Sequence, residues 1–164
     1  MLRFSLILLL LGLMACEEDE AINSEPGNPE TQALKDTALI IGTFYGLCFP
    51  RDSCVDIYKV SADRIYADTT YHYPYDTAGY RFEALAKDQF QKVEQLKAIF
   101  PRQLVTDTTT KQGCPDCRDQ GGYYIALKAA DYHKRWLIDK DLEAVSPYLH
   151  PFLQKVDTAV RQLP

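Results

Sequence analysis

Cysteines supply the residue types and the spacing in this chain that most directly suggest chemistry. Cys114 and Cys117 have two residues between them, and Cys48 and Cys54 have five. Two thiols at the closer spacing can form a disulfide, work as a redox pair, or present two thiolates to one metal ion. Which of these uses applies depends on the compartment in which the protein resides, because oxidising compartments favour disulfides.

Local disulfide pairing is the interpretation that we favour for these four cysteines. If the segments around Cys48 and Cys54 form a hairpin, the two residues close opposite ends of a short loop and come within disulfide reach. Cys114 would then pair with Cys117. Four cysteines allow three pairings, so a cross-link between the two loops stays open as the alternative.

Two resemblances give the second pair an alternative, thiol-dependent function. Cys114-Pro115-Asp116-Cys117 resembles the redox pair of thioredoxins, in which a helix begins at the first cysteine and lowers its pKa. Here Gly121 and Gly122 and a strand follow instead. The motif also resembles the metal knuckle of zinc ribbons and rubredoxins, but the five-residue spacing of the other two cysteines departs from a second knuckle. We therefore expect no metal site and no cofactor.

An aromatic segment is the second candidate site. Tyr71, His72, Tyr73 and Tyr75 lie within a predicted loop, and tyrosine-rich loops can bind a protein, a peptide or a carbohydrate. Alternatively, alternate rings of an extended segment cover an apolar face of the sheet. We expect no catalytic residues, because no serine sits in a nucleophile elbow, no carboxylate pair has a distinctive spacing and no glycine-rich phosphate loop is present. The three histidines, His72, His133 and His150, show no ligand spacing.

The first residues of the chain have the layout of an export signal. Arg3 precedes an apolar run from Phe4 to Leu13, which is too short to span a bilayer as a helix. The sequence Leu13-Met14-Ala15-Cys16 that ends this run resembles the lipobox of bacterial lipoproteins. That resemblance implies cleavage after residue 15 and acylation of Cys16, which anchors the chain in a membrane.

An acidic, proline-containing segment follows Cys16. Glu17, Glu18, Asp19 and Glu20 come first, and few large apolar residues occur before residue 36, so residues 16–36 are predicted to be a flexible tether. The acidic run also resembles the signal that sends some lipoproteins of Gram-negative bacteria to the surface. We expect a cell-envelope location at the outer membrane, facing the periplasm or the surface.

Charge and length define the part after the tether. Without residues 1–15 the chain keeps 17 basic and 23 acidic residues, so its net charge is −6 and nucleic acid is an improbable partner. Residues 37–164 have the length of one globular domain.

Short alternating or β-branched segments bounded by turn residues predict most of this domain to be β-sheet. The predicted strands are Ala38–Gly46, Cys54–Val60, Arg64–Asp68, Tyr80–Ala86, Tyr123–Ala130 and His133–Asp139.

Two apolar stripes at helical spacing predict two amphipathic helices. The first is expected to start at a capping Asp88 and to end at Phe100, and the second is expected to begin near Pro151 and to run to the end of the chain. Residues 106–122 are predicted to be a long irregular loop. The expected fold is α+β, an antiparallel sheet of about five to six strands with both helices packed on one face.

One more resemblance concerns the whole domain. Gly42-Thr43-Phe44-Tyr45-Gly46 with Cys48, the Cys114–Cys117 motif and Gly121-Gly122 are similar to a group of small, functionally uncharacterised lipoproteins. This resemblance implies one folded domain and adds no chemistry. The sequence therefore favours a lipid-anchored, non-enzymatic binding or structural module, with a redox or metal-binding use of Cys114 and Cys117 as the alternative.

Overall fold

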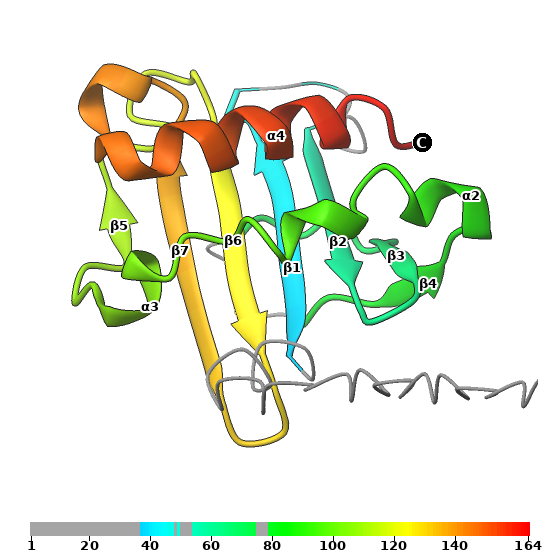
Figure 1. Cartoon of the computed structure of the whole chain (residues 1–164). Coiled ribbons are helices and arrows are strands. Elements are labelled where there is room, and N and C mark those ends of the chain that lie inside the picture. Colours follow the sequence, from blue (N-terminus) through cyan, green and yellow to red (C-terminus); the bar gives the residue numbers. More distant parts are fainter. Residues whose placement is uncertain (1–36, 48, 50–53, 75–78) are drawn as a thin grey trace, which may run out of the picture.

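A single sheet with helices on one face forms the core of the computed structural model, which describes residues 37–47, 49, 54–74 and 79–164 (Figure 1). The sheet has seven strands in the order β4-β3-β2-β1-β6-β7-β5. All neighbouring pairs are antiparallel except β5 with β7. The strands are β1 (Ala38–Phe44), β2 (Val55–Val60), β3 (Ile65–Asp68), β4 (Phe82–Ala84), β5 (Lys111–Gln112), β6 (Gly122–Lys128) and β7 (His133–Asp139).

Strand β1 is central because both of its faces are apolar. Leu39 and Ile41 are fully buried on one face, and Ile40 and Phe44 are buried on the other. Strand β1 must therefore be covered on both faces, and it pairs with β2 along one edge and with β6 along the other. Gly42 lies where a side chain would overlap the backbone oxygen of Asp56.

Helix α4 (His150–Val160) covers the first face and begins where the sequence predicts. Proline at its second position is tolerated, because the first turn of a helix leaves its N–H groups unpaired. Its apolar stripe is buried against the sheet together with Trp136 of β7, which is 0% exposed. The stripe consists of Phe152, Leu153, Val156, Ala159 and Val160.

The predicted helix from Asp88 to Phe100 is wrong in detail. The segment instead forms helix α2 (Lys87–Phe90), the 3-10 helix η2 (Glu94–Leu96) and turns, and helix α3 (Gln103–Thr106) follows. Asp88 does not cap α2, whose N-cap is Ala86. The segment crosses the sheet in front of β1 and β6 (Figure 1) and buries Val93, Leu96 and Phe100 almost completely. Short helical turns therefore bury these residues, and the continuous helix that their spacing suggests does not form.

The predicted irregular loop over residues 106–122 contains one element that the sequence analysis missed. Strand β5 adds parallel to the edge of β7, with Lys111 opposite Leu137 and Gln112 opposite Ile138. Two residues are too few to produce an alternation in the sequence, so only the edge of β7 defines this strand.

A second apolar cluster occupies the opposite face of the sheet. Ile40, Phe44, Ile57 and Tyr124 are among its buried members, and Tyr73, Tyr80, Phe82 and Leu137 pack against it. The domain is therefore a mixed α and β fold with a mostly antiparallel sheet, as expected. Its sheet is larger than the five to six strands predicted, and its described part has three α-helices instead of two. None of the described helices combines the length and apolarity of a bilayer span.

Candidate functional site

A disulfide joins Cys114 to Cys117, the local pairing that the sequence analysis favours. The four residues form a turn in which the Cys117 N–H donates to the Cys114 carbonyl at 3.2 Å. Pro115 suits the second position of such a turn, and Asp116 at the third has a positive φ of 62°. No helix begins at Cys114, so the dipole that activates a thioredoxin-type thiol is missing from this motif.

The buried carboxylate of Asp139 fastens this turn to the end of β7. Asp139 is only 3% exposed. Its oxygens accept hydrogen bonds from the Cys114 N–H at 2.8 Å, the Asp141 N–H at 2.9 Å and the Gln120 amide at 3.2 Å. Burial by itself would raise the pKa of Asp139, but the donated hydrogen bonds outweigh it and hold the pKa below the ordinary value.

Asp116 connects the same turn to β1. Its Oδ1 accepts the Gly46 N–H at 2.8 Å and the Gly121 N–H at 3.1 Å. The Asp116 N–H donates to the Gly121 carbonyl at 2.9 Å, which closes a loop of six residues onto itself. Gly121 has a φ of 79°, a conformation that favours glycine, and any side chain there would overlap the Phe44 carbonyl. The disulfide loop is thus fixed to two strands.

Both sulfurs belong to exposed residues and line an open pocket of about 520 Å³. Arg118 and Gln120 contribute to the wall of this pocket, together with Asp139 and Asp141. The two carboxylates would oppose the formation of thiolates if the disulfide were reduced, because like charges disfavour each other. Accessibility therefore suits a redox role, whereas the electrostatics and the fixed backbone suit a structural disulfide.

A second polar cluster lies at the same end of the sheet, on the helix side. Lys140 follows β7, and its Nζ donates to the Tyr45 hydroxyl at 2.6 Å and lies 3.7 Å from the Asp157 carboxylate of α4. The ammonium also lies 4.4 Å from the centre of the Tyr45 ring and 5.2 Å from that of Tyr123. Two aromatic rings and a carboxylate therefore surround this cation.

Burial changes the titration of the groups around Lys140. It raises the pKa of Tyr123 to about 12, and the nearby negative charge of Asp157 adds to this effect. It also raises the pKa of Asp56 above the ordinary value, although Lys140 opposes the change. A tyrosine with so high a pKa stays protonated at neutral pH and is a hydrogen-bond donor, here toward Asp157 at 3.4 Å. The cluster therefore links β6, β7 and α4.

The Lys140 cluster was not predicted from the sequence, although the sequence contains one signal for it. Lys140 continues the alternation of the buried Trp136 and Ile138 along β7, which places it on the helix side. Asp157 lies next to Val156 in the apolar stripe of α4, which also indicates the side that faces the sheet. Their meeting depends on where α4 crosses the sheet, and that crossing is not encoded locally.

The aromatic loop is partly folded back onto the second face. The Tyr73 hydroxyl donates to the Tyr45 carbonyl at 2.7 Å, and its ring packs against the second cluster. Tyr71 is 39% exposed with a φ of 52°, and its N–H donates to the buried Asp68 carboxylate at 3.0 Å. The buried Nδ1 of His72 has no hydrogen-bond partner among the described residues. The structure thus supports the covering interpretation for Tyr73 and leaves Tyr71 as the accessible ring.

The other predicted site residues do not converge on one site. Cys54 is in a disulfide, while Cys16, Cys48 and Tyr75 lie outside the described residues. His133 is exposed at the start of β7, and His150 contacts the Val145 carbonyl at 3.2 Å. Within the described ranges no three His, Cys, Asp or Glu side chains are placed to hold a metal ion.

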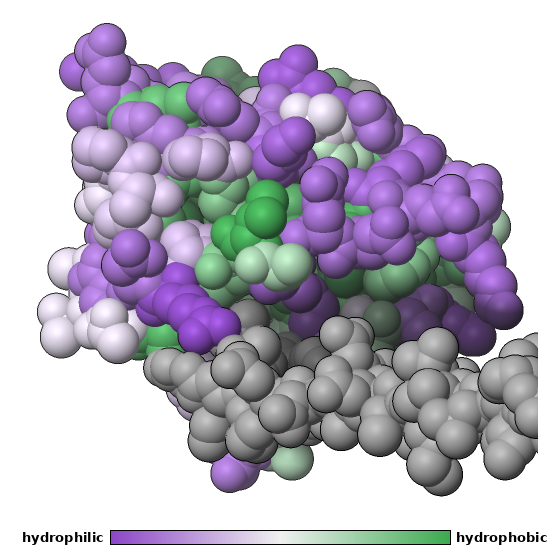
Figure 2. Space-filling view, viewed as in Figure 1, coloured by the Kyte–Doolittle hydropathy of each residue, from purple (hydrophilic) through white to green (hydrophobic). Residues whose placement is uncertain are grey.

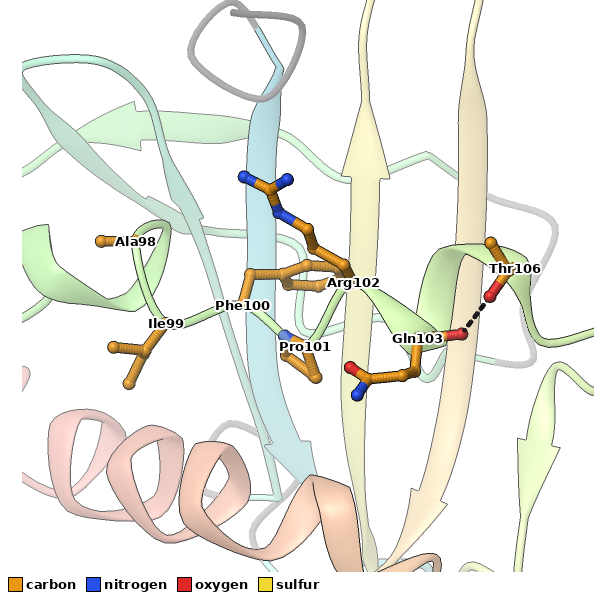
Figure 3. A pocket seen from close by; sticks show the side chains of 7 residues that line it. All are labelled: Ala98, Ile99, Phe100, Pro101, Arg102, Gln103 and Thr106. Atoms are coloured by element: carbon orange, nitrogen blue, oxygen red, sulfur yellow. Dashed lines mark hydrogen bonds between the residues drawn. The ribbon is translucent and has the colours of Figure 1, made fainter. Parts of the chain in front are cut away.

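A shallow pocket of about 570 Å³ lies on the crossing segment. Ile99, Pro101 and Gln103 turn toward the side on which α4 runs, and Arg102 turns the other way (Figure 3). Ile99 is 43% exposed, and Figure 2 shows a small apolar area on this face between polar side chains. The hydroxyl of Thr106 donates to the Gln103 carbonyl at 3.0 Å, so it stabilises α3. This pocket brings no nucleophile and no acid–base pair together.

In comparisons with known proteins, no protein-family model and no curated protein matches this chain.

Proposed function

We propose that this chain is a lipid-anchored protein of the cell envelope whose folded domain binds or scaffolds a partner and does not turn over a substrate. The observation that carries the proposal is the state of the cysteines in the domain. Cys114 and Cys117 are joined to each other in a fixed loop, and Cys54 is also in a disulfide. Disulfides persist in the oxidising compartments to which a lipobox directs a protein.

The polar groups of the domain support a structural use in the same way. Asp116 and Asp139 each accept several hydrogen bonds from the chain around the disulfide. Lys140 is surrounded by Tyr45, Tyr123 and Asp157. Groups that are engaged in this manner hold strands and helices together, and they would lose these contacts if they moved to take part in a reaction.

Membrane fractionation of Cys16→Ser tests the anchor. We expect the wild-type protein to pellet with membranes and to carry acyl chains, and the variant to lose both properties, since acylation requires the Cys16 thiol. The double variant Cys114→Ser/Cys117→Ser is the matched control because it removes two cysteines and keeps Cys16. A Cys16→Ser protein that keeps its acyl chains would contradict the anchor.

A thiol-dependent function is the second candidate, because Cys114 and Cys117 are exposed and line a pocket. It predicts free thiols or bound metal in protein isolated from its native envelope. Mass spectrometry without reducing agent, combined with metal analysis, distinguishes the two candidates. Fully oxidised, metal-free cysteines that resist moderate glutathione ratios would exclude the thiol-dependent function. Turnover of a substrate in a broad hydrolase and reductase screen would instead exclude the leading proposal.

A further inference from the structure

A pocket of about 540 Å³ lies at the end of the sheet opposite the disulfide loop. Residues from the start of β1, the turn after β2, strand β4 and the hairpin between β6 and β7 line it. Figure 1 shows that the start of β1, the end of β2 and the β6–β7 hairpin lie at the same lower edge of the sheet. This is also the edge at which the described chain begins, at residue 37.

Strand register places two lysines across β1 in this pocket. Lys59 of β2 is opposite Ile40, and Lys128 of β6 is opposite Ala38. Because β2 and β6 flank β1 and these positions share a face, both side chains lie on the side of the sheet that α4 does not cover. Their strands are two spacings apart, roughly 10 Å, and both residues line the same pocket.

The pocket is positively charged in a chain whose net charge is −5. No carboxylate lines it, and within the described part of the chain no ion pair involves Lys59 or Lys128. The Lys59 ammonium lies 4.3 Å from the centre of the Tyr66 ring and 5.0 Å from that of Phe82, which holds its stem on an apolar surface. Two ammonium groups at one pocket, with no carboxylate among its lining residues, favour an anion.

The remaining wall combines a hydroxyl donor with apolar surface. Ser61 offers a hydroxyl group, while Phe82 and small alanine side chains make up much of the rest. An anion with an attached apolar part matches this wall better than a bare ion, because both the charge and the carbon chain find contacts.

We propose that this pocket binds the phosphate of an anionic membrane phospholipid. The pocket lies at the edge where the chain arrives from the tether, and this position favours a lipid as the source of the phosphate. This step rests on the proposed function, in which the tether leads to an acylated Cys16 and keeps this edge near a bilayer. Juxtamembrane lysines contribute about 1 kcal/mol each near an anionic surface, which corresponds to about five-fold in affinity.

Vesicle sedimentation of unlipidated protein, residues 17–164, tests the pocket. We expect binding to vesicles that contain phosphatidylglycerol and much weaker binding to vesicles of phosphatidylcholine alone. Lys59→Gln and Lys128→Gln should each weaken the binding about five-fold, and the double variant about 30-fold. Lys155→Gln is the control because it removes an exposed lysine of α4 on the other side of the sheet and should leave binding within about two-fold.

Several outcomes would overturn the inference. Equal binding of the double variant and the wild type to phosphatidylglycerol vesicles would show that the two lysines are not the site. Calorimetry can show whether inorganic phosphate binds to the pocket. If phosphate binds and the vesicles do not, the ligand is free phosphate instead of a lipid. Lys128→Gln keeps the test valid if Lys59→Gln loses its ring contacts and fails to fold.

The anchor and the pocket can fail separately. The vesicle assay uses protein without acyl chains, so its result does not depend on Cys16. Lysine-dependent vesicle binding by a protein whose Cys16 is not acylated in cells would support the pocket and refute the anchor.

Discussion

Replacing Asp139 tests whether the disulfide loop depends on a buried carboxylate. In Asp139→Asn one oxygen becomes an amide nitrogen, which cannot accept a hydrogen bond. The Cys114 N–H at 2.8 Å from Oδ2 would then face a donor, while Oδ1 could still accept from Asp141 and Gln120. One charge-assisted hydrogen bond is lost, so we expect the free energy of unfolding to fall by about 1.5–3 kcal/mol.

The pH dependence of this loss follows from the direction of the pKa shift. The pKa of Asp139 lies below its ordinary value of 3.8, so the folded state binds the proton more weakly than the unfolded state does. The stabilisation is therefore complete above the ordinary pKa and disappears as the pH falls through the lower folded-state value. The difference between wild type and Asp139→Asn should be constant from about pH 5 to about pH 8 and should shrink in more acidic solution.

Urea unfolding with the disulfides kept oxidised measures this difference. Asp119→Asn is the matched control, because Asp119 is an exposed carboxylate of the same loop and asparagine tolerates its positive φ of 58°. We expect this control to stay within about 0.5 kcal/mol of the wild type. If Asp139→Asn is as stable as Asp119→Asn at neutral pH, the carboxylate does not hold the loop and the reasoning is refuted.

Three further changes test other parts of the structure. Gly42→Ala should lower the free energy of unfolding by about 3 kcal/mol or prevent folding, because the added Cβ would overlap the Asp56 carbonyl and lie 2.6 Å from the Ile57 side chain. Gly79→Ala, with open space around it, is the control in thermal unfolding, and equal stability of the two variants would contradict the packing of β1 on β2. Cys114→Ser/Cys117→Ser should cost about 2 kcal/mol in urea unfolding, the loop entropy of so short a ring, and a much larger loss would mean that the disulfide supports the core as well. Asp56→Asn should raise the free energy of unfolding at neutral pH, because burial raises the pKa of this carboxyl and penalises its charged form. The gain should vanish as acid protonates Asp56 in the wild type, and a gain that persists in acid would have another cause.

The local patterns of the sequence determined most of the strands and the last helix. The six predicted strands all exist, because β-branched and aromatic residues alternate or cluster between turn residues. The stripe of α4 and the tolerated Pro151 placed that helix correctly. The short spacing of Cys114 and Cys117 also indicated their pairing, since residues so close in sequence meet in a turn. The interpretation of residues 1–36 stays a prediction, because these residues lie outside the described structure.

Only the tertiary structure decided the features that depend on distant partners. The spacing of Val93, Leu96 and Phe100 fits a helix, but the chain buries them in successive turns as it crosses the sheet. Strand β5 exists because the edge of β7 offers it hydrogen bonds.

The polar contacts of the domain depend on the register in the same way. Asp139 meets Cys114 across 25 positions, and Lys140 meets Tyr45 across 95. Lys59 and Lys128 share a pocket only because β2 and β6 flank β1. Alternation along each strand fixes the side on which such a residue lies, but the order and register of the strands select its neighbours.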